Sequence, residues 1–415
     1  MLTGNDETGL PEKEISPRKH IVVVGIGYVG LPAAIMLARA GHQVTGYDIN
    51  QALVDDINNG VMRHINEQEL HDLLQDERVK QNLRAQGEPC RADAYMIAVP
   101  TPLDHRKKIA DLTYVTSAVE SLLPYLRKGN LVIVESTVPP LTCREVVTPL
   151  IEKTGLRVGE DILLAHCPER ILPGKIFYEI VHNDRIIGGT TREASEAARE
   201  IYASFVKGNL YLTDDVTAEL CKLMENTYRD VNIALANELA AVADTLGVDI
   251  KQAIDLANKH PRVNLLKPGI GVGGHCIPID PWFIKEVDPA NSQLIFTART
   301  INDDMPSRVA AKIRRAVRGI PSPKIVAIGA TYKPDTNDLR ESPALQVVEL
   351  LREDGCNVAL YDPIAPEYHC NSVYDVAAGA DCLVILIEHE VVRKELAERE
   401  DEIKAIMARP LIVRF

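Results

Sequence analysis

The stretch Gly25-Ile26-Gly27-Tyr28-Val29-Gly30 decides the fold of this chain. It follows an apolar run at 21–24 and opens a helical stretch, and Asp48 lies 18 residues beyond Gly30, at the end of the next apolar run. In this context the first glycine permits a tight turn, the second lets backbone amides approach a pyrophosphate, and the third allows close helix packing. Asp48 would bind ribose hydroxyls and repel a 2′-phosphate, so the pattern predicts NAD rather than NADP. The structural alternative is a glycine-rich turn in which Asp48 only caps a helix.

Outward from this motif, short β-branched runs alternate with helical stretches. We expect strands at residues 21–24, 43–47, 94–99, 131–135 and 162–165. Near-continuous apolar strands separated by helices predict a parallel, doubly wound sheet. After Pro321 and Pro323 the alternation resumes, which predicts a second, smaller α/β domain. Its expected strands lie at 324–329, 358–361 and 382–387, with a helix at 343–353.

The middle of the chain differs from both ends. Residues 215–246 contain neither Gly nor Pro, which predicts one long amphipathic helix. Its expected apolar stripe consists of Leu220, Leu223, Met224, Val231 and Leu235. The fold class that we expect is therefore α/β, with two Rossmann-like doubly wound domains joined by a long central helix and further helices. The expected parts are a flexible tail at 1–19, a dinucleotide-binding domain at 20–212, a central helical segment at 213–307 and the second α/β domain at 308–415.

The composition argues against several classes of partner. The 46 Lys and Arg residues against 59 Asp and Glu give a net charge of −13, which disfavours nucleic acid or an anionic membrane as the main partner. No run of 18 apolar residues appears, and the start of the chain is polar and acidic, so we expect a cytoplasmic protein. The 8 cysteines form no CxxC pair and show no zinc-like spacing to histidine, so we expect no metal site.

A second glycine-rich stretch runs from Lys267 to Trp282. Four glycines lie there, at positions 269, 271, 273 and 274, so another group must approach this backbone closely. Cys276 ends the glycine-rich part, and Asp280 follows four residues later. A cysteine chosen at random is usually an inert packing residue, but one on such a loop near His275 and Asp280 also fits a thiolate nucleophile. The residues alone leave both interpretations open.

The expected long helix carries an unusual set of polar residues. Lys222 and Asn226 share one face because they are about one turn apart. A solvated polar face is the simpler interpretation. Asn226, Asn232 and Asn237 are poor helix formers, however, and helix propensity does not explain why this helix has so many. A polar site lined by the helix would explain them.

Loops at the ends of the expected strands carry further polar groups. The stretches 99–102, 135–139 and 167–170 each end a strand on the edge where open α/β sheets bind ligands. In the second α/β domain, the turn at 332–343 supplies two cations, Lys333 and Arg340, as a phosphate site requires. The alternative for each of these stretches is ordinary loop chemistry.

Taken in order, these stretches resemble the UDP-glucose/GDP-mannose dehydrogenase family, from about His20 to Val413. The longest motifs end at Gly174 (CPERILPG) or begin at Glu225 (ENTYRDVN), His260 (HPRVN) and Gly273 (GGHCIPIDPW). The resemblance implies an NAD domain, a helical dimerisation segment and a UDP-sugar-binding domain, in a homodimer whose subunits share active sites. It also implies oxidation of the C6 alcohol of a UDP-sugar to a carboxylate through a thioester. The motif variants imply UDP-N-acetyl-D-mannosamine as substrate, with UDP-N-acetylglucosamine and UDP-glucose as alternatives.

The resemblance also assigns roles to single residues. The implied catalytic residues are the nucleophile Cys276, the alkoxide-stabilising Lys222, the hydrogen-bonding supports Asn226 and Asp280, the base Glu169, and Thr137, which positions water and nicotinamide. The implied cofactor positions are Tyr28, Val29, Asp48, Thr101, Thr137 and Arg340, beside Gly25, Gly27 and Gly30. The implied substrate positions are Arg170, Ile171, Lys222, Asn226, Arg229, His260, Arg262, Gly273, Tyr332 and Lys333.

Two other classes of protein fit the sequence less well. A two-electron alcohol or hydroxyacid dehydrogenase would need neither Cys276 nor a second α/β domain with two cations in one turn. A non-catalytic NAD sensor would keep the glycine motif but would tolerate the loss of Lys222, Cys276 and Glu169, all of which are present.

Overall fold

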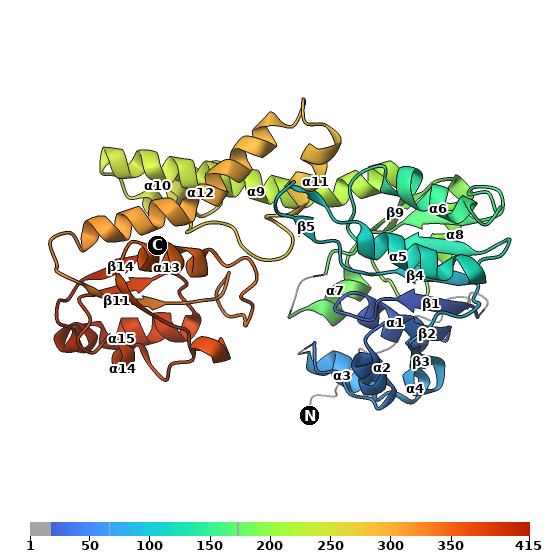
Figure 1. Cartoon of the computed structure of the whole chain (residues 1–415), viewed down its shortest axis with the longest axis horizontal. Coiled ribbons are helices and arrows are strands. Elements are labelled where there is room, and N and C mark those ends of the chain that lie inside the picture. The colour runs from blue at the N-terminus through green and yellow to red at the C-terminus, as the bar shows by residue number, and fades with distance from the viewer. Residues whose placement is uncertain (1–17, 66, 172–173) are drawn as a thin grey trace. The chain divides into compact units, whose positions relative to one another are not determined.

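The computed structural model describes residues 18–65, 67–171 and 174–415. Most of the tail expected at 1–19 therefore lies outside the described residues. The chain divides after Leu223 into two compact units, of which the second is Met224–Phe415. Figure 1 labels many of the helices and strands of both units, and each unit is described by itself.

The first unit is built around a sheet of eight strands in the order β3-β2-β1-β4-β7-β8-β9-β10. The bounds are β1 (His20–Val24), β2 (Gln43–Tyr47), β3 (Leu83–Gln86), β4 (Ala94–Ile97), β7 (Leu131–Val134), β8 (Leu163–His166), β9 (Arg185–Gly189) and β10 (Leu210–Asp214). The strands from β3 to β8 in this order are parallel. The predicted doubly wound sheet is thus confirmed. The sequence did not predict β3, β9 and β10, of which β9 pairs antiparallel with β8.

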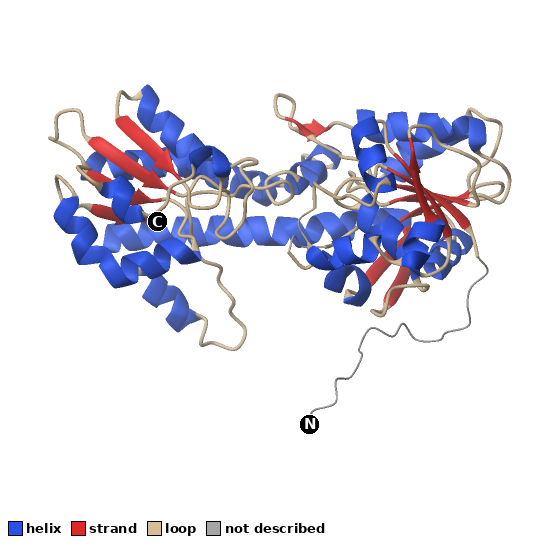
Figure 2. Ribbon diagram, turned by 90° about the horizontal axis from the view of Figure 1, so that it is seen from below, coloured by secondary structure: helices blue, strands red, loops and turns tan. Residues whose placement is uncertain are grey.

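Helices cover both faces of this sheet, because successive side chains of a buried strand point to opposite sides. In β1, Ile21 and Val23 join one core and Val22 and Val24 the other. The first core also contains α1 (Gly30–Arg39) and α8 (Arg192–Tyr202), and the second α5 (Thr113–Leu122) and α6 (Thr148–Glu152). Figure 2 shows the strands of this sheet between helices.

The remaining elements of the first unit are short. They are α2 (Gln51–Asn58), α3 (Gln68–Leu74), α4 (Glu77–Asn82), α7 (Ile176–His182), the hairpin β5 (Leu103–Asp104) and β6 (Ile109–Ala110), the 3₁₀ turn η1 (Leu123–Tyr125) and the π-helical turn η2 (Cys143–Val147). The loops that follow the parallel strands leave the sheet at one edge, which is where this fold class binds its ligands.

One helix, α9 (Asp215–Leu246), crosses the boundary between the units, and it has the bounds that the absence of Gly and Pro predicts. Before it, Asp214 accepts hydrogen bonds from the backbone N–H (3.1 Å) and hydroxyl (2.6 Å) of Thr217 and so caps its first turn. The expected apolar stripe is not its buried face, since Met224 and Leu235 are exposed. Polar side chains at helical spacing are buried instead, namely Asp215, Glu219, Lys222, Asn226, Asp230 and Asn237.

The second unit contains the rest of α9 and a smaller sheet. The four strands β12 (Asn357–Tyr361), β11 (Lys324–Ile328), β13 (Cys382–Ile385) and β14 (Ile412–Arg414) lie in this order and are all parallel. The helices are α10 (Ile250–Ala257), α11 (Asp280–Val287), α12 (Gln293–Ala316), α13 (Pro343–Glu353), the 3₁₀ turn η3 (Pro366–Tyr368), α14 (Val373–Ala377) and α15 (Glu390–Ile406). Two apolar cores cover the two faces of the sheet, which confirms the second α/β domain. In the described part of the chain, no helix has both the length and the apolarity that a membrane span requires.

Candidate active site

The glycine motif lies between β1 and α1, and its three glycines meet different surroundings. A Cβ on Gly25, whose φ is +84°, would lie 2.7 Å from the Ala98 carbonyl oxygen. A Cβ on Gly30 would lie 1.9 Å from the carbonyl oxygen of Gly25, whereas one on Gly27 would meet nothing within 4 Å. The first and third glycines are therefore required by packing, and the second leaves open space beside the start of a helix, where an anion can approach the backbone.

Asp48 follows β2 and faces the glycine motif. Its carboxylate accepts hydrogen bonds from the backbone N–H groups of Ile26 (3.1 Å) and Asn50 (2.9 Å). Asn50, not Asp48, caps α2 with its side chain, so the interpretation of Asp48 as a simple helix cap is wrong. A carboxylate can accept about four hydrogen bonds, so Asp48 retains acceptor sites for ribose hydroxyls.

Two loops at the same edge of the sheet are tied together. The Ser136 hydroxyl donates to the carbonyl of Val99 (2.7 Å) and accepts the N–H of Val99 (3.0 Å), which joins the loop after β7 to the loop after β4. These loops carry the candidate residues Thr137 and Thr101. The Thr101 hydroxyl oxygen is buried without a hydrogen-bond partner among the described residues. Together with the open space at Gly27, this unused polar atom fits an edge that holds a dinucleotide.

Glu169 lies after β8 in a buried ion cluster that the sequence did not predict. One of its oxygens accepts the Arg170 N–H (2.7 Å), and the other pairs with the guanidinium of Arg185 (2.5 Å). Arg185 lies farther from Glu135 (3.6 Å), which instead accepts the hydroxyl of Tyr202 (2.7 Å). Burial, and then the charge of Glu169, raise the pKa of Glu135 to about 7, although Arg185 and Tyr202 oppose the rise. Glu135 therefore holds a proton at a higher pH than an ordinary carboxyl group does.

The side chains around this cluster differ in accessibility. Arg170 donates a hydrogen bond to the carbonyl of Asp184, and Ile171 packs against a core of the first unit. The two residues that follow in the motif, at 172–173, lie outside the described residues. On α9, the Lys222 side chain is buried, and no hydrogen bond or ion pair of its ammonium is found within the described ranges. A buried cation of this kind requires an anionic or polar partner, which a substrate oxygen would supply.

In the second unit, Asn226 donates a hydrogen bond to the carboxylate of Asp280 (2.5 Å) and accepts one from the exposed Arg229. Asp280 begins α11, and its backbone N–H donates to the carbonyl of Cys276 (2.9 Å). Cys276 is exposed at this turn. Asn226 and Cys276 thus both contact Asp280, so the interpretation of Asn226 as part of a solvated face is wrong.

The glycine-rich loop before Cys276 packs against the turn at 332–341. A Cβ on Gly273 would lie 2.5 Å from the Glu341 carbonyl oxygen, and one on Gly274 would lie 2.9 Å from the Tyr332 ring. The Gly274 N–H also donates to the carbonyl of Arg340 (3.0 Å). The group that the glycines allow to approach is therefore the protein's own turn, and this contact places Cys276 beside the predicted nucleotide residues.

The two cations that the sequence predicts for this turn, Lys333 and Arg340, have different surroundings. Arg340 pairs with Asp338, the closest distance being 2.7 Å, so its charge is partly neutralised within the turn. The Lys333 ammonium lies 5.6 Å from the centre of the Tyr332 ring. The His275 side chain is exposed, but partial desolvation, and then the charge of Arg340, lower its pKa, which favours the neutral imidazole next to Cys276. His260 and Arg262 are exposed in the segment after α10, where the Arg262 N–H donates to His260 Nδ1 (3.4 Å).

One buried group was not expected from the sequence. Cys143, His166 and Glu219 bring three potential metal-ligand atoms within 4.8 Å of one another. Both Glu219 oxygens already accept backbone hydrogen bonds, from Leu141 and Cys143. The spacing of these residues along the chain carries no motif that could have revealed them. The sequence held a weak signal for the buried ion cluster, because Arg185 directly precedes an apolar run and Glu135 directly follows one.

Comparisons with known proteins match most of the described chain. Models of the UDP-glucose/GDP-mannose dehydrogenase family match residues 19–206 (NAD binding domain), 216–304 (central domain) and 326–414 (UDP binding domain). The UDP-N-acetyl-D-mannosamine dehydrogenase of Methanocaldococcus jannaschii is 49% identical over 377 residues, which cover 90% of this chain and 86% of that relative. That of Methanococcus maripaludis strain S2 is 47% identical over 392 residues, covering 93% of this chain and 90% of the relative.

Solved structures give the same result. The UDP-D-ManNAc dehydrogenase from Pyrococcus horikoshii has a TM-score of 0.88 and 41% identity, and the match covers 95% of this chain and 94% of that one. The native UDP-N-acetyl-mannosamine dehydrogenase from Staphylococcus aureus has a TM-score of 0.83 and 42% identity with the same coverage. The chain therefore belongs to the UDP-glucose/GDP-mannose dehydrogenase family.

Proposed function

We propose that the protein oxidises the C6 alcohol of UDP-N-acetyl-D-mannosamine to a carboxylate, and that it reduces two NAD for each sugar. One water is consumed, two NADH form and three protons are released. NAD accepts the two hydrides. The relatives that are 47–49% identical and bear this substrate in their names support the proposal. The observation that carries it is the position of Cys276, exposed beside Asp280 and against the Tyr332–Arg340 turn.

The first oxidation requires that the alcohol lose a proton while hydride leaves, so the oxygen needs a cation and a route for the proton. Lys222 supplies a buried ammonium, and it lies one turn of α9 before Asn226, whose amide is oriented by Asp280. The charge that develops on the oxygen is thus met by a cation that is not already neutralised within the described residues.

The aldehyde carbon is then attacked by the Cys276 sulfur. The new C–S bond gives a thiohemiacetal, whose remaining carbon-bound hydrogen can leave as the second hydride, so that a thioester is formed. Water attacks the thioester carbon, and the C–S bond breaks to return the thiolate. We assign the base for this water to Glu169, which Arg185 holds through a short buried ion pair, and the positioning of the water to Thr137.

We also propose that two copies of the chain form a closed dimer with shared sites. Five large apolar side chains of α9 are exposed at intervals of four and seven residues, namely Met224, Tyr228, Leu235, Val242 and Leu246. Such a stripe on a long helix fits the same stripe of a second copy. In this dimer, Arg262 completes the sugar site of the partner subunit.

We also place the protein in the cytoplasm, a reducing compartment in which its eight free cysteines would stay reduced.

Sugars other than N-acetylmannosamine are competing candidates for the substrate. A Ralstonia relative called NDP-N-acetyl-D-galactosaminuronic acid dehydrogenase is 44% identical to this chain over 397 residues, so a galacto-configured sugar is the second candidate. The test is the NADH yield and kcat/KM on a panel of UDP-N-acetylmannosamine, UDP-N-acetylglucosamine, UDP-N-acetylgalactosamine and UDP-glucose. The highest kcat/KM on the first, with two NADH for each sugar, is the expected result. Faster turnover of another sugar would overturn the substrate, and one NADH for each sugar would overturn the reaction.

A further inference from the structure

Three buried polar residues of α9 lie on one face of its first turns. Asp215, Glu219 and Lys222 are spaced by four and three residues, which places them along one line of the helix. Asp215 and Glu219 are fully buried, and Lys222 is 8% exposed. Lys222 is the proposed cation of the first oxidation, so the two acids before it face the same part of the first unit.

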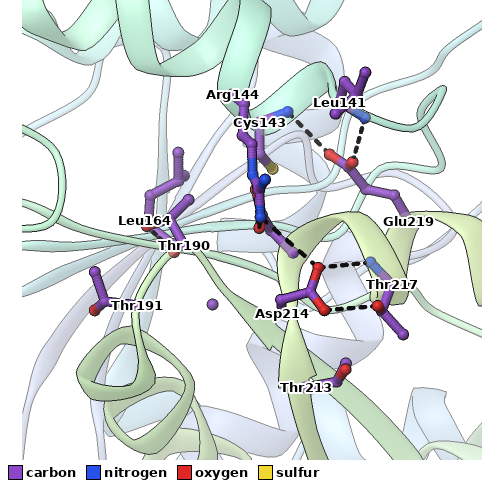
Figure 3. Close-up of polar contacts among 12 residues, drawn as sticks. Leu141, Cys143, Arg144, Leu164, Thr190, Thr191, Thr213, Asp214, Thr217 and Glu219 are labelled. Carbon is purple, nitrogen blue, oxygen red and sulfur yellow. Dashed lines mark hydrogen bonds and ion pairs between the residues drawn. The ribbon is translucent and has the colours of Figure 1, made fainter.

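Both acids hold the segment that follows the Thr137 loop. Glu219 accepts the N–H of Leu141 with one oxygen (2.7 Å) and the N–H of Cys143 with the other (2.9 Å). Figure 3 shows this carboxylate between the two backbone groups. Arg144, the next residue, forms a bidentate pair with Asp215 (2.7 and 3.0 Å). Two successive turns of α9 therefore bind three of the four positions from Leu141 to Arg144.

The turn that is held in this way is strained. Leu141 has a φ of +75°, a region that β- and γ-branched residues rarely occupy. Without its hydrogen bond to Glu219, the backbone around Leu141 would lower its free energy by relaxing to another conformation. Thr137 lies four residues before Leu141, so such a relaxation would shift the Thr137 loop relative to α9 and hence relative to Lys222.

We propose that Glu219 is a positioning residue that fixes the Thr137 loop relative to Lys222 on α9, so that both are aligned for hydride transfer. The proposal rests on the proposed function, because Thr137 and Lys222 have their roles only there. Small displacements of catalytic groups are costly, since a shift of about 1 Å can reduce a rate on the order of a hundredfold. Substrate affinity depends mainly on other residues and is expected to change little.

A second interpretation of Glu219 is that it binds a metal ion with Cys143 and His166, whose ring nitrogens have no hydrogen-bond partner among the described residues. The geometry favours the positioning role, because each Glu219 oxygen already has a backbone donor at 2.7 or 2.9 Å. Zinc bound at Glu219 is therefore one of the results that would overturn the positioning role.

The experiment compares wild type with Glu219→Gln, Glu219→Asp and the control Asp214→Ala, all in the full chain. Gln presents an N–H group to a backbone N–H, and Asp is one methylene too short to reach both amides. Asp214 is exposed and caps the same helix. It lies 3.8 Å from Arg144, but the Leu141 and Cys143 amides donate to Glu219, so its variant weakens the start of α9 and leaves these two amide hydrogen bonds in place. We expect the Glu219 variants to lose at least about tenfold in kcat, with KM for both substrates within about threefold. For Asp214→Ala we expect a lower melting temperature and a kcat within about twofold of wild type.

A second readout is the hydrogen exchange of the Leu141 and Cys143 amides. These two amides should exchange at least about tenfold faster in the Glu219 variants and at the wild-type rate in Asp214→Ala. If Glu219→Gln does not fold, Glu219→Asp, which keeps the charge, carries both measurements. If the wild type oxidises no UDP-sugar, the proposed function fails, and unchanged exchange at the two amides then still decides against Glu219.

Besides unchanged exchange at the two amides, three results would overturn the positioning role. The first is a kcat within twofold of wild type in both Glu219 variants. The second is a loss of kcat in Asp214→Ala equal to that in the Glu219 variants at the same loss of melting temperature. The third is one equivalent of zinc that co-purifies with the wild type and is absent from Glu219→Gln, which would make Glu219 a metal ligand.

Discussion

Replacing Gly27 and Gly30 by alanine, one at a time, should separate cofactor binding from folding. The two positions are three residues apart in one motif and receive the same added methyl group. At Gly30 the new Cβ would lie 1.9 Å from the Gly25 carbonyl oxygen and 3.1 Å from the Ala98 side chain, so the helix must move away from the strand by more than 1 Å. Overpacking of this kind costs about 1–3 kcal/mol of folding free energy.

At Gly27 the same methyl group meets no atom within 4 Å. The stability of Gly27→Ala should therefore stay within about 0.5 kcal/mol of wild type. The methyl group occupies the space through which a pyrophosphate reaches the backbone. If two hydrogen bonds to a charged group are lost, at about 1.5–3 kcal/mol each, NAD affinity falls by about 3–6 kcal/mol, which is on the order of a hundredfold or more.

The assays are denaturant unfolding of the unliganded protein and calorimetric titration with NADH. We expect Gly30→Ala to unfold at lower denaturant, and Gly27→Ala to unfold like wild type but to bind NADH at least a hundredfold more weakly. Wild-type NADH affinity in Gly27→Ala would refute the assignment of the open space to the pyrophosphate. Wild-type stability in Gly30→Ala would refute the packing argument.

The remaining predictions concern the cofactor, the shared site and pH. Asp48→Ser should raise kcat/KM for NADP relative to NAD, because a carboxylate about 4 Å from a phosphate charge costs on the order of 4 kcal/mol at an effective dielectric of 20; an unchanged preference in steady-state assays would sink the role of Asp48. Mixing inactive Arg262→Ala with inactive Cys276→Ala under subunit exchange should restore about a quarter of wild-type activity, since about half of the dimers are hybrids with one whole site; no recovery despite proven exchange would refute the shared site. Glu135, whose pKa is raised to about 7, binds a proton in the folded state that the unfolded state releases above its ordinary pKa of 4.5, so its contribution to stability is complete at low pH and is lost as pH rises through about 7. The difference in unfolding free energy between wild type and Glu135→Gln should therefore change by up to about 3 kcal/mol between pH 5 and 8, with wild type losing stability as pH rises; a constant difference across this range would contradict the assignment of the proton to Glu135.

Local patterns predicted most of the fold. The bounds of α9 and α13 follow from the absence of Gly and Pro in one and from a Pro start in the other. The strands β3, β9 and β10 were missed. The edge strands are β3 and β10, which expose Arg84 and Tyr211, whereas β9 is a mostly buried inner strand that begins with Arg185 and ends with two glycines. Strands at an edge of a sheet bury only part of their side chains, so hydrophobic periodicity is a weak signal there.

The candidate site was predicted only where one short stretch contains the chemistry. The glycine motif with Asp48 and the loop that ends at Cys276 are of this kind. The buried partners were missed because they are far apart in the chain, as with Glu219, which contacts Cys143 across 76 residues. The asparagines of α9 show the same limit, since buried Asn237 accepts the N–H of Gly269 (2.9 Å), whereas half-buried Asn232 donates to a carbonyl of its own helix, that of Tyr228 (2.7 Å).

The covalent step on Cys276 is the central claim, and it can be tested by mass spectrometry of an enzyme that is slow to hydrolyse its thioester. Glu169→Gln removes the proposed base but leaves the nucleophile in place, so the acyl group should accumulate on the enzyme. The variant is mixed with UDP-N-acetyl-D-mannosamine and NAD, quenched in acid and digested, and the peptide that contains Cys276 is weighed. We expect a peptide heavier by the acyl group of the sugar nucleotide, and no such acyl-enzyme when Cys276 is also replaced by alanine. An unmodified Cys276 peptide, in a sample quenched after two NADH have formed for each enzyme subunit but before free uronate appears, would contradict the thioester mechanism.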